Sequence, residues 1–415
     1  ECYKDSGIDW LGEIPESWDT KRLKYVLSER NERSKTGDEP LLMVSQKYGL
    51  VIRADYHDKA TVAFSSIDNK IVYKNDLVFN KLKAHLGVFY KSEIDLKGIV
   101  SPDYAVYKSK AYVEDLKFLE LLFKLPTYIQ QFIIRATGVA EGLIRLYTNE
   151  LFDLPIPIPP LAEQKNILKF IDNNFTQIDQ AIALKQQQIA KLEEYKQVVI
   201  QNAVTKGLSP DAPMKDSGVD WIGNIPEHWG VKRLMFVTEN FNKKVLSSES
   251  DLPYLGMESI ESKTGQLSNE SSEAEGLAAY FKKGQILFGK LRPYLAKVYL
   301  TNSEGLCSTE FMVMSVRPEI SNTFLKYQLL SNRFIAQVNS STYGTKMPRA
   351  NAEYIKRQSV TLPPLQEQQL IVRYIDSITN QTNQTLSSYK TQIDRLKEYK
   401  TILINQAVTG KIKVS

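Results

Sequence analysis

The chain has few residues of the types that build metal sites and disulfide frameworks. Its 415 residues include only two cysteines, Cys2 and Cys307, and three histidines, His57, His85 and His228. The cysteines lack CxxC or zinc-like spacing, so we interpret them as a terminal thiol and a buried small apolar residue. The histidines are too scattered to predict a metal cluster.

Long apolar runs are also missing. No window approaches the roughly 18 apolar residues that a membrane-spanning helix needs, and the first ten residues lack the basic start and apolar centre of a signal peptide. We therefore expect a cytoplasmic protein. The content of 42% hydrophobic and 24% charged residues is typical of a globular chain, and the length favours about two to three domains. A net charge of +5 is compatible with a polyanionic partner without requiring one.

No catalytic motif is complete. Gly284-Gln285-Ile286-Leu287-Phe288-Gly289-Lys290 fits the first seven positions of a phosphate-binding loop, but Leu291 follows where a Ser or Thr should bind magnesium. There is no Gly-x-Ser-x-Gly elbow, no Gly-rich cofactor fingerprint and no Asn-Pro-Pro-aromatic stretch of an adenine methyltransferase. Carboxylate pairs such as Glu193-Glu194 are interpreted as solvated charge. We expect no catalytic residue, cofactor or metal in this chain.

What the chain does have is an internal repeat. Lys4-Asp5-Ser6-Gly7-Ile8-Asp9-Trp10-Leu11-Gly12-Glu13-Ile14-Pro15 recurs 211 residues later, starting at Lys215. Glu194-Tyr195-Lys196 and Ala203-Val204-Thr205 recur 204 residues later. The chain is therefore a tandem of two halves, and the variable region of the first is seven residues longer.

Each variable region reads as a mixed α+β domain with a curved sheet. Short β-like runs at 77–79 and 105–107 have counterparts at 286–288 and 311–314. An amphipathic helix is expected to follow in each half, around 113–124 and 320–338. The loop-forming stretch 206–213, with Gly207, Pro210 and Pro213, is the predicted linker between halves.

A long helix is predicted at the end of each half. The first runs from 161 to about 204, and the second is opened by the stretch 362–368 and runs to about 408. Apolar residues in these stretches alternate in steps of four and three, which is the heptad pattern of a coiled coil. The first seam contains Ile171, Phe175, Ile178, Ile182, Ile189 and Leu192, and the second contains Ile375, Leu386, Ile393, Leu396 and Leu403. Polar residues interrupt the seam at Lys185, Thr379, Thr382 and the pair Lys196 and Lys400.

Helices of this length outrun a single small domain, because about 45 residues at roughly 1.5 Å each reach on the order of 65 Å. Two in one chain most simply pair with each other. Pseudo-twofold symmetry between the repeats would make them antiparallel, with one globular domain at each end. The predicted segments are domain 1 at 1–155, helix region 1 at 156–208, domain 2 at 209–360 and helix region 2 at 361–415.

Basic and aromatic residues group at matching places in both variable regions. One group follows a shared strand, and the other precedes the Pro-rich entry to the long helix. In loops of this kind Arg or Lys can contact phosphates or guanine, and Asn can read adenine. The candidate DNA-binding residues are Lys81, Lys83, His85, Arg145, Tyr147, Lys290, Arg292, Tyr294, Lys346, Arg349 and Asn351. Ordinary solvated loops are the alternative.

Together, these motifs resemble the specificity subunit of type I restriction-modification systems. The residues that carry the resemblance are the Lys-Asp-Ser-Gly-x-Asp-Trp start, the Pro-Pro-Leu-x-Glu-Gln helix entry, Leu-x-Glu-Tyr-Lys and the closing Ala-Val-Thr, each present in both halves. The family's DNA-reading loops vary, so the candidate residues are placed by location and not by motif. The first half also has Glu141 and no Pro-Arg pair in its second loop.

The resemblance implies two target-recognition domains, each reading one half of a bipartite site in double-stranded DNA. It also implies an antiparallel coiled coil that sets the spacer between half-sites and docks two modification subunits. Those partners bind S-adenosylmethionine and methylate adenine, while restriction subunits bring ATP- and Mg-dependent translocation and cleavage. This chain itself would be noncatalytic. A scaffold that binds only protein is the main alternative, and an enzyme in its own right is a more distant one.

Overall fold

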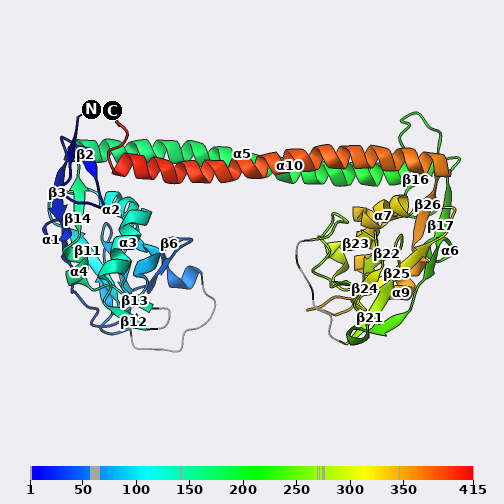
Figure 1. Ribbon diagram of the computed structural model, residues 1–415, viewed down its shortest axis with the longest axis horizontal. Coiled ribbons are helices and arrows are strands. Elements are labelled where there is room, and N and C mark those ends of the chain that lie inside the picture. Colours follow the sequence, from blue (N-terminus) through cyan, green and yellow to red (C-terminus); the bar gives the residue numbers. More distant parts are fainter. Residues whose placement is uncertain are drawn as a thin grey trace. The chain divides into compact units, whose positions relative to one another are not determined.

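The computed structural model describes residues 2–56, 66–140, 143–268, 270, 272, 276–344 and 346–414. The chain divides into two compact units: unit 1 contains Glu1–Leu184 and Gln392–Ser415, and unit 2 contains Lys185–Thr391. The divisions fall inside two long helices, α5 (Leu161–Lys206) and α10 (Leu365–Val408). Each unit therefore consists of a globular domain and a part of each long helix (Figure 1).

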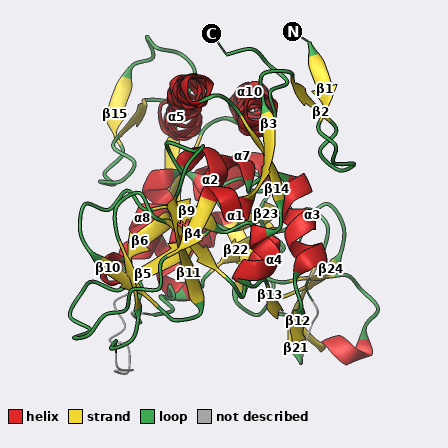
Figure 2. Cartoon of the chain, turned by 90° about the vertical axis from the view of Figure 1, so that its left-hand side faces the viewer, coloured by secondary structure: helices red, strands yellow, loops and turns green. Residues whose placement is uncertain are grey.

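Unit 1 is a mixed α+β domain (Figure 2). Its strands are β1 (Tyr3–Asp5), β2 (Glu13–Pro15), β3 (Asp19–Arg22), β4 (Leu27–Glu29), β5 (Leu42–Ser45), β6 (Gly49–Ile52), β7 (Lys70–Val72), β8 (Leu77–Asn80), β9 (Phe89–Lys91), β10 (Gly98–Val100), β11 (Tyr104–Ser109), β12 (Gly138–Ala140), β13 (Leu143–Arg145) and β14 (Pro155–Ile158). Its short helices are α1 (Leu23–Val26), η1 (Arg53–Asp55), η2 (Ala84–Leu86), α2 (Lys117–Leu122), α3 (Pro126–Arg135) and α4 (Thr148–Phe152).

Unit 2 repeats this arrangement. Its strands are β15 (Met214–Asp216), β16 (Asn224–Pro226), β17 (Gly230–Arg233), β18 (Thr238–Asn240), β19 (Lys244–Leu246), β20 (Tyr254–Leu255), β21 (Leu277–Phe281), β22 (Ile286–Gly289), β23 (Val298–Leu300), β24 (Gly305–Cys307), β25 (Phe311–Val316) and β26 (Ser359–Leu362). Its short helices are α6 (Leu234–Val237), η3 (Ser247–Glu249), η4 (Pro293–Leu295), α7 (Asn322–Leu330), α8 (Asn332–Ser340) and α9 (Ala352–Arg357).

The main sheet of each unit has four antiparallel strands in the same order, β4-β11-β8-β9 in unit 1 and β18-β25-β22-β23 in unit 2. Successive side chains of its central strands enter two separate cores. Leu77 and Phe79 of β8 lie in the core shared with α2 and α3, whereas Val78 lies in a second core with Val72 and Val100. This alternation is the period of two expected for a strand, and burial on both faces explains the continuous apolar runs in the sequence.

The four strands predicted from those runs are confirmed, since they lie in β8, β11, β22 and β25. The supposed phosphate-binding loop contains the buried strand β22. Both long helices are confirmed as well, and Lys206, assigned above to the linker, is the last residue of α5.

The shorter helices predicted after the sheet were wrong in extent. The helix expected around 320–338 is two helices, because Ser331 between α7 and α8 has extended backbone. In unit 1, α2 ends at Leu122, and a second helix that was not predicted, α3, begins at Pro126. Leu125 is extended there, as the residue before a proline prefers to be.

The repeated sequence motifs anchor each domain to the long helices. Trp18 of unit 1 and Trp229 of unit 2 are fully buried beside a helix end. A Cβ built on Gly410, which follows α10, would lie 3.1 Å from the Trp18 ring, and one on Gly207, which follows α5, would lie 3.1 Å from Trp229. Both glycines have φ of +73°, so the left-handed helix end and the close tryptophan both favour glycine.

The glutamine of each Pro-Pro-Leu-x-Glu-Gln motif is a buried clamp at the start of the long helix. Gln164 donates to the carbonyls of Pro159 (2.8 Å) and Tyr112 (2.6 Å). Gln368 does the same with Pro363 (2.8 Å) and Glu319 (3.2 Å), and its side-chain oxygen accepts from the Ser321 amide (2.7 Å). The motif therefore fixes α5 and α10 to the domain beside which each begins.

The long helices pair in an antiparallel coiled coil. In unit 1 the core joins Ile167 and Ile171 of α5 to Ala407 of α10, and Lys400 contacts Asp179 at 2.8 Å. In unit 2 Lys196 donates to Asn383 at 3.3 Å and the Lys185 ammonium lies 4.7 Å from the Tyr389 ring centroid. The predicted apolar seam residues are buried or half-buried in both units. Lys185 and Lys400 thus enter the seam by covering aromatic rings or pairing with carboxylates.

Candidate nucleic-acid interface

The two loops that the sequence singled out in each half lie against each other. In unit 1 the Leu146 amide donates to the Lys81 carbonyl at 3.0 Å, and in unit 2 the Ala350 amide donates to the Lys290 carbonyl, also at 3.0 Å. These hydrogen bonds bring Arg145 beside Lys81, and Arg349 beside Lys290. In Figure 1, β12 and β13 of unit 1 lie at the end of the domain away from the long helices.

An arginine with a carboxylate partner stands at the same place in both units. Arg145 Nη2 lies 2.5 Å from Asp103 Oδ1, and Arg349 Nη2 lies 2.6 Å from Glu310 Oε1. Both acids immediately precede the equivalent strands β11 and β25. The loops differ in sequence, since Pro348 precedes Arg349 and no proline precedes Arg145. Both arginines nevertheless pair with a carboxylate at the equivalent position. The position of Glu141, the other difference between these loops, lies outside the described residues.

Both arginines keep an exposed side. Their side chains are 36% and 46% exposed, although Nε of Arg145 is buried. An exposed ion pair of this kind contributes little to stability. Its effect is to orient the planar guanidinium, whose remaining N–H groups can donate to a phosphate or to guanine O6 and N7.

The lysine beside each arginine has a different environment in the two units. Lys81 lies 3.5 Å from Glu29, which also receives a 3.0 Å hydrogen bond from the buried Lys70. Lys290 instead donates to the Thr309 carbonyl at 2.9 Å. Burial lowers the pKa of the Lys290 ammonium. The unit 1 lysine is therefore held by an internal carboxylate, whereas the unit 2 lysine is held by a neutral carbonyl.

The other candidate residues differ in how exposed they are to solvent. Tyr147 is exposed, and the Arg145 guanidinium lies 5.4 Å from its ring centroid. Lys83 is exposed and precedes η2, which contains the half-buried His85 and lies against β13. The remaining candidates in unit 2 are the exposed Tyr294 and Lys346 and the half-buried Arg292.

Asn351 has a structural role that the sequence reading did not consider. Its side-chain oxygen accepts from the Glu353 amide at 2.8 Å and so caps the start of α9. The capping bond uses one of the two acceptor positions of the carboxamide oxygen and holds the side chain toward the start of α9. The two-bond contact of an asparagine with adenine would need this same oxygen.

The sequence reading missed the acids that orient the arginines. A signal for them exists, because Ser101-Pro102-Asp103-Tyr104 and Ser308-Thr309-Glu310-Phe311 share a Ser-x-acid-aromatic pattern. The two copies of the pattern are 207 residues apart, which lies between the separations of 204 and 211 residues of the stronger motifs. It would have been found by aligning the two β11-like strands.

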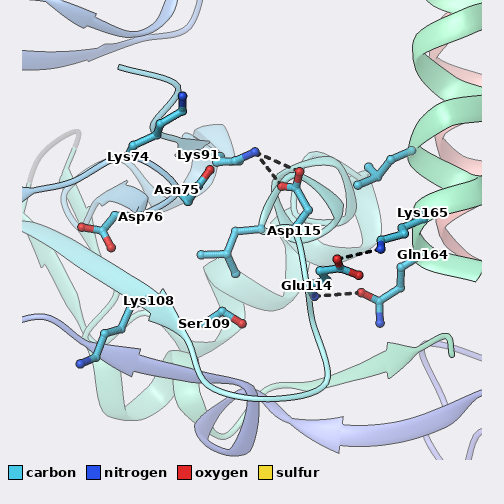
Figure 3. Close-up of a pocket in the computed structure, with 12 residues that line it drawn as sticks. Lys74, Asn75, Asp76, Lys91, Lys108, Ser109, Glu114, Asp115, Gln164 and Lys165 are labelled. Carbon is cyan, nitrogen blue, oxygen red and sulfur yellow. Dashed lines mark hydrogen bonds and ion pairs between the residues drawn. The ribbon is translucent and has the colours of Figure 1, made fainter. Parts of the chain in front are cut away.

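A cavity of about 610 Å³ in unit 1 lies elsewhere, where the domain meets the start of α5 (Figure 3). Two ion pairs lie within its lining: Lys91 with Asp115 at 2.9 Å, and Lys165 with Glu114 at 2.9 Å. In unit 2 the equivalent place is bridged by a hydrogen bond from Asn322 to the Gly284 carbonyl at 2.5 Å. The mixed charge of this cavity does not favour a polyanion.

Among the residues that the structure describes, no group of three or more His, Cys, Asp or Glu side chains could hold a metal ion. The described helices include none that is both long and apolar enough to cross a membrane. Cys307 is buried, as expected, and burial raises its pKa to about 12.

Comparison with known proteins agrees with this arrangement. The family described as Type I restriction modification DNA specificity domain matches residues 15–194 and 226–395. The MjaVIII specificity subunit of Methanocaldococcus jannaschii, a type I restriction enzyme, is 24% identical over 97% of this chain and 94% of its own length. The EcoDI specificity subunit of Escherichia coli is 27% identical over 61% of this chain and 63% of its own length.

Two solved structures have the same fold. A chain from a study of complex assembly and conformational transition in the type I R-M system superposes with a TM-score of 0.71 at 16% identity, covering 96% of this chain and 99% of that one. The HsdS subunit of Thermoanaerobacter tengcongensis superposes with a TM-score of 0.57 at 16% identity, covering 96% and 98% of the two chains.

Proposed function

The chain belongs to the family of type I restriction-modification DNA specificity subunits, and from this premise we propose that each unit reads one half of a bipartite site in double-stranded DNA. The observation that carries the proposal is the duplicated pair of a half-exposed arginine and its carboxylate beside a lysine, Arg145 with Lys81 and Arg349 with Lys290. Each unit has its own copy, so each can read its own half-site.

The chemistry of the arrangement suits base reading. A carboxylate holds the guanidinium in one plane, and the plane of the guanidinium sets its two-bond geometry toward guanine. The neighbouring lysines supply phosphate contacts, which position the protein without reading sequence. The exposed Tyr147 and Tyr294 add surface for contact with sugar and base. A few base contacts per unit, each worth about 1–3 kcal/mol, would then define the half-site.

The coiled coil has a separate role in this proposal. It sets the number of base pairs between the half-sites and docks two methyltransferase subunits, to which restriction subunits can be added. This chain contributes recognition and no chemistry. S-adenosylmethionine, ATP and Mg belong to the partner subunits, and the complex works in the cytoplasm. The antiparallel helices and their exposed apolar residues, including Tyr195 and Tyr399 of the repeated Leu-x-Glu-Tyr-Lys motif, support this role.

The test is to map methylated adenines in a genome that expresses this chain with a modification subunit. One bipartite motif is expected, with two specific parts and a fixed spacer. A motif with a single part would contradict two independent readers. Methylation by the chain alone would contradict its noncatalytic role. Failure of the assembled complex to bind duplex DNA in a salt-sensitive way would favour a protein scaffold.

The spacer can be tested by inserting one heptad into both helices, so that their pairing is kept. Seven residues add roughly 10 Å and DNA rises about 3.4 Å per base pair, so the accepted spacer should grow by about three pairs. An unchanged spacer would contradict the role of the helices as the ruler.

A further inference from the structure

A polar hollow of about 360 Å³ adjoins Arg349 in unit 2. It lies between the residues that follow β18, the end of β22 and the start of β25. Its polar lining consists of Asn240, Asn242, Lys244, Lys290 and Thr309, and the rest of its lining is apolar. No carboxylate lines it, so two lysines and two amides face the hollow without a negative group.

The backbone around the hollow is the same in unit 1, so the two units can be compared residue by residue. The Phe241 amide donates to the Val313 carbonyl at 2.9 Å, and the Arg30 amide donates to the Val106 carbonyl at 2.7 Å. This equivalence places Asn240 where unit 1 has Glu29. Lys244 pairs with Ala279 across two strands, as Arg33 pairs with Lys70, so Ala279 stands where unit 1 has Lys70.

In unit 1 the carboxylate of Glu29 occupies the equivalent space. The Glu29 carboxylate accepts from Lys70 at 3.0 Å and lies 3.5 Å from Lys81, the counterpart of Lys290. Lys70 is 4% exposed, so its side chain occupies space that the methyl group of Ala279 leaves open. Unit 2 thus keeps the lysine of this cluster but has no carboxylate at the Glu29 position. The Glu310 carboxylate, which pairs with Arg349, still acts on the Lys290 ammonium through its charge.

We infer that the hollow of unit 2 binds a backbone phosphate of DNA, in the place that the Glu29 carboxylate takes in unit 1. The inference rests on the proposed function, because Arg349 places DNA at this face. Lys290 and Lys244 would donate to the phosphate oxygens together with the amide groups of Asn240 and Asn242. The side chains of Asn240, Asn242 and Lys244 make no hydrogen bond to another described residue. They are therefore free to turn toward a ligand. A partly buried ammonium such as Lys290 gains from an anionic partner.

The inference is tested in the assembled complex by exchanging the side chains at these two equivalent positions between the units. The double variant N240E/A279K builds the ion pair of unit 1 into unit 2, and E29N/K70A opens unit 1. Binding of duplex DNA that carries the complex's own site is measured as a function of salt. Removing one phosphate contact should reduce the slope of log K against log salt by about 1 and leave the methylated motif unchanged.

When salt is raised from 50 to 200 mM, the factor by which N240E/A279K loses DNA affinity should be roughly 3.5 times smaller than the factor for the parent. E29N/K70A should lose more affinity than the parent over the same range. Lys283→Ala removes an exposed lysine at the other end of β22 and is the matched control, with an unchanged slope expected. Inorganic phosphate at constant ionic strength should weaken the parent more than N240E/A279K.

Two results would overturn the inference. An unchanged salt slope in N240E/A279K, with both half-sites still methylated, would mean that the hollow takes no phosphate while the proposed function stands. A changed base in the unit 2 half-site would mean that the hollow reads sequence. If the parent complex methylates no bipartite motif, the proposed function itself fails and the inference fails with it.

Discussion

Unit 1 and unit 2 share a main sheet with one strand order but place different charges beside it. Where unit 1 has Glu29 and Lys70, unit 2 has Asn240 and Ala279, and the lysine beside them is kept. The oriented arginine is also kept, with Asp103 as its partner in one unit and Glu310 in the other. A duplicated domain can therefore change its local charge at a few side chains while its main sheet and its anchoring motifs stay the same.

The largest expected effect tests whether the two anchoring tryptophans stabilise their units equally. Trp18→Ala and Trp229→Ala each remove a fully buried ring against a helix end, so each should cost about 3–5 kcal/mol of stability. Hydrogen exchange should show loosening confined to the unit that carries the change. Denaturant unfolding measures the loss, and a negligible loss for either variant would refute equal anchoring.

The glutamine clamps offer a second comparison. Gln164→Ala leaves the buried Pro159 carbonyl without a donor, and Gln368→Ala does the same to the Pro363 carbonyl, at about 1–3 kcal/mol for each unpaired group. Thermal unfolding should therefore shift downward for both. Gln369→Ala, at the exposed neighbouring position, is the control and should change little. A similar shift in the control would remove the clamp explanation.

The arginines sharpen the comparison at the level of DNA. Arg145→Ala should lower discrimination in one half-site and Arg349→Ala in the other, each by about 1–3 kcal/mol. Competition between correct and altered duplexes gives the measurement. Arg349→Lys keeps the charge but not the planar fork, so it should retain affinity and lose discrimination. Equal loss in both half-sites from a single change would contradict separate readers.

The smallest expected effect is a pH dependence at Glu29 of unit 1 that the equivalent Asn240 of unit 2 lacks. Burial alone raises the pKa of Glu29, but the hydrogen bond and charge of Lys70, with the charge of Lys81, outweigh it and hold the pKa below 4.5. A carboxylate with a lowered pKa stabilises the fold above its unfolded pKa, and this stability is lost as pH falls through the folded pKa. The stability difference between the parent and Glu29→Gln should therefore shrink as pH falls below about 4.5.

Unfolding followed at several pH values checks this difference. Asn240→Ala changes the equivalent position of unit 2, where no carboxylate titrates, so its effect on stability should not vary over the same range. A difference for Glu29→Gln that stays constant with pH would mean that the Lys70 contact does not lower the Glu29 pKa.

Much of the fold could be predicted from sequence because local patterns determine it. The duplicated motifs, the heptad steps and the buried strands such as β8 and β22 are all visible as spacing along the chain. The helix break at Ser331 was not predicted, because an amphipathic pattern continues across it. The division into four segments at 155, 208 and 360 stays a prediction.

The candidate site was harder to predict, because its contacts join distant residues. The loops around Lys81 and Arg145 could be named from their composition, but Arg145 and Asp103 are 42 residues apart, and Glu29 and Lys70 are 41 apart. The members of each pair belong to different sheets or loops, so only tertiary packing brings them together. Side chains that pair across strands carry no signal along the chain, so the acids that orient the arginines and the anion of unit 1 were missed.

The carboxylate beside each arginine also bears on how the protein would search DNA. An arginine that keeps Asp103 or Glu310 at hydrogen-bond distance presents little net charge to a passing phosphate backbone. It would therefore release few condensed counterions on DNA of the wrong sequence, and so would add little to nonspecific affinity. A guanine edge can share the guanidinium without displacing its acid, whereas a phosphate is repelled by that acid. If the two arginines read bases as proposed, the carboxylates that orient them would also shorten the time that the complex spends on DNA of the wrong sequence.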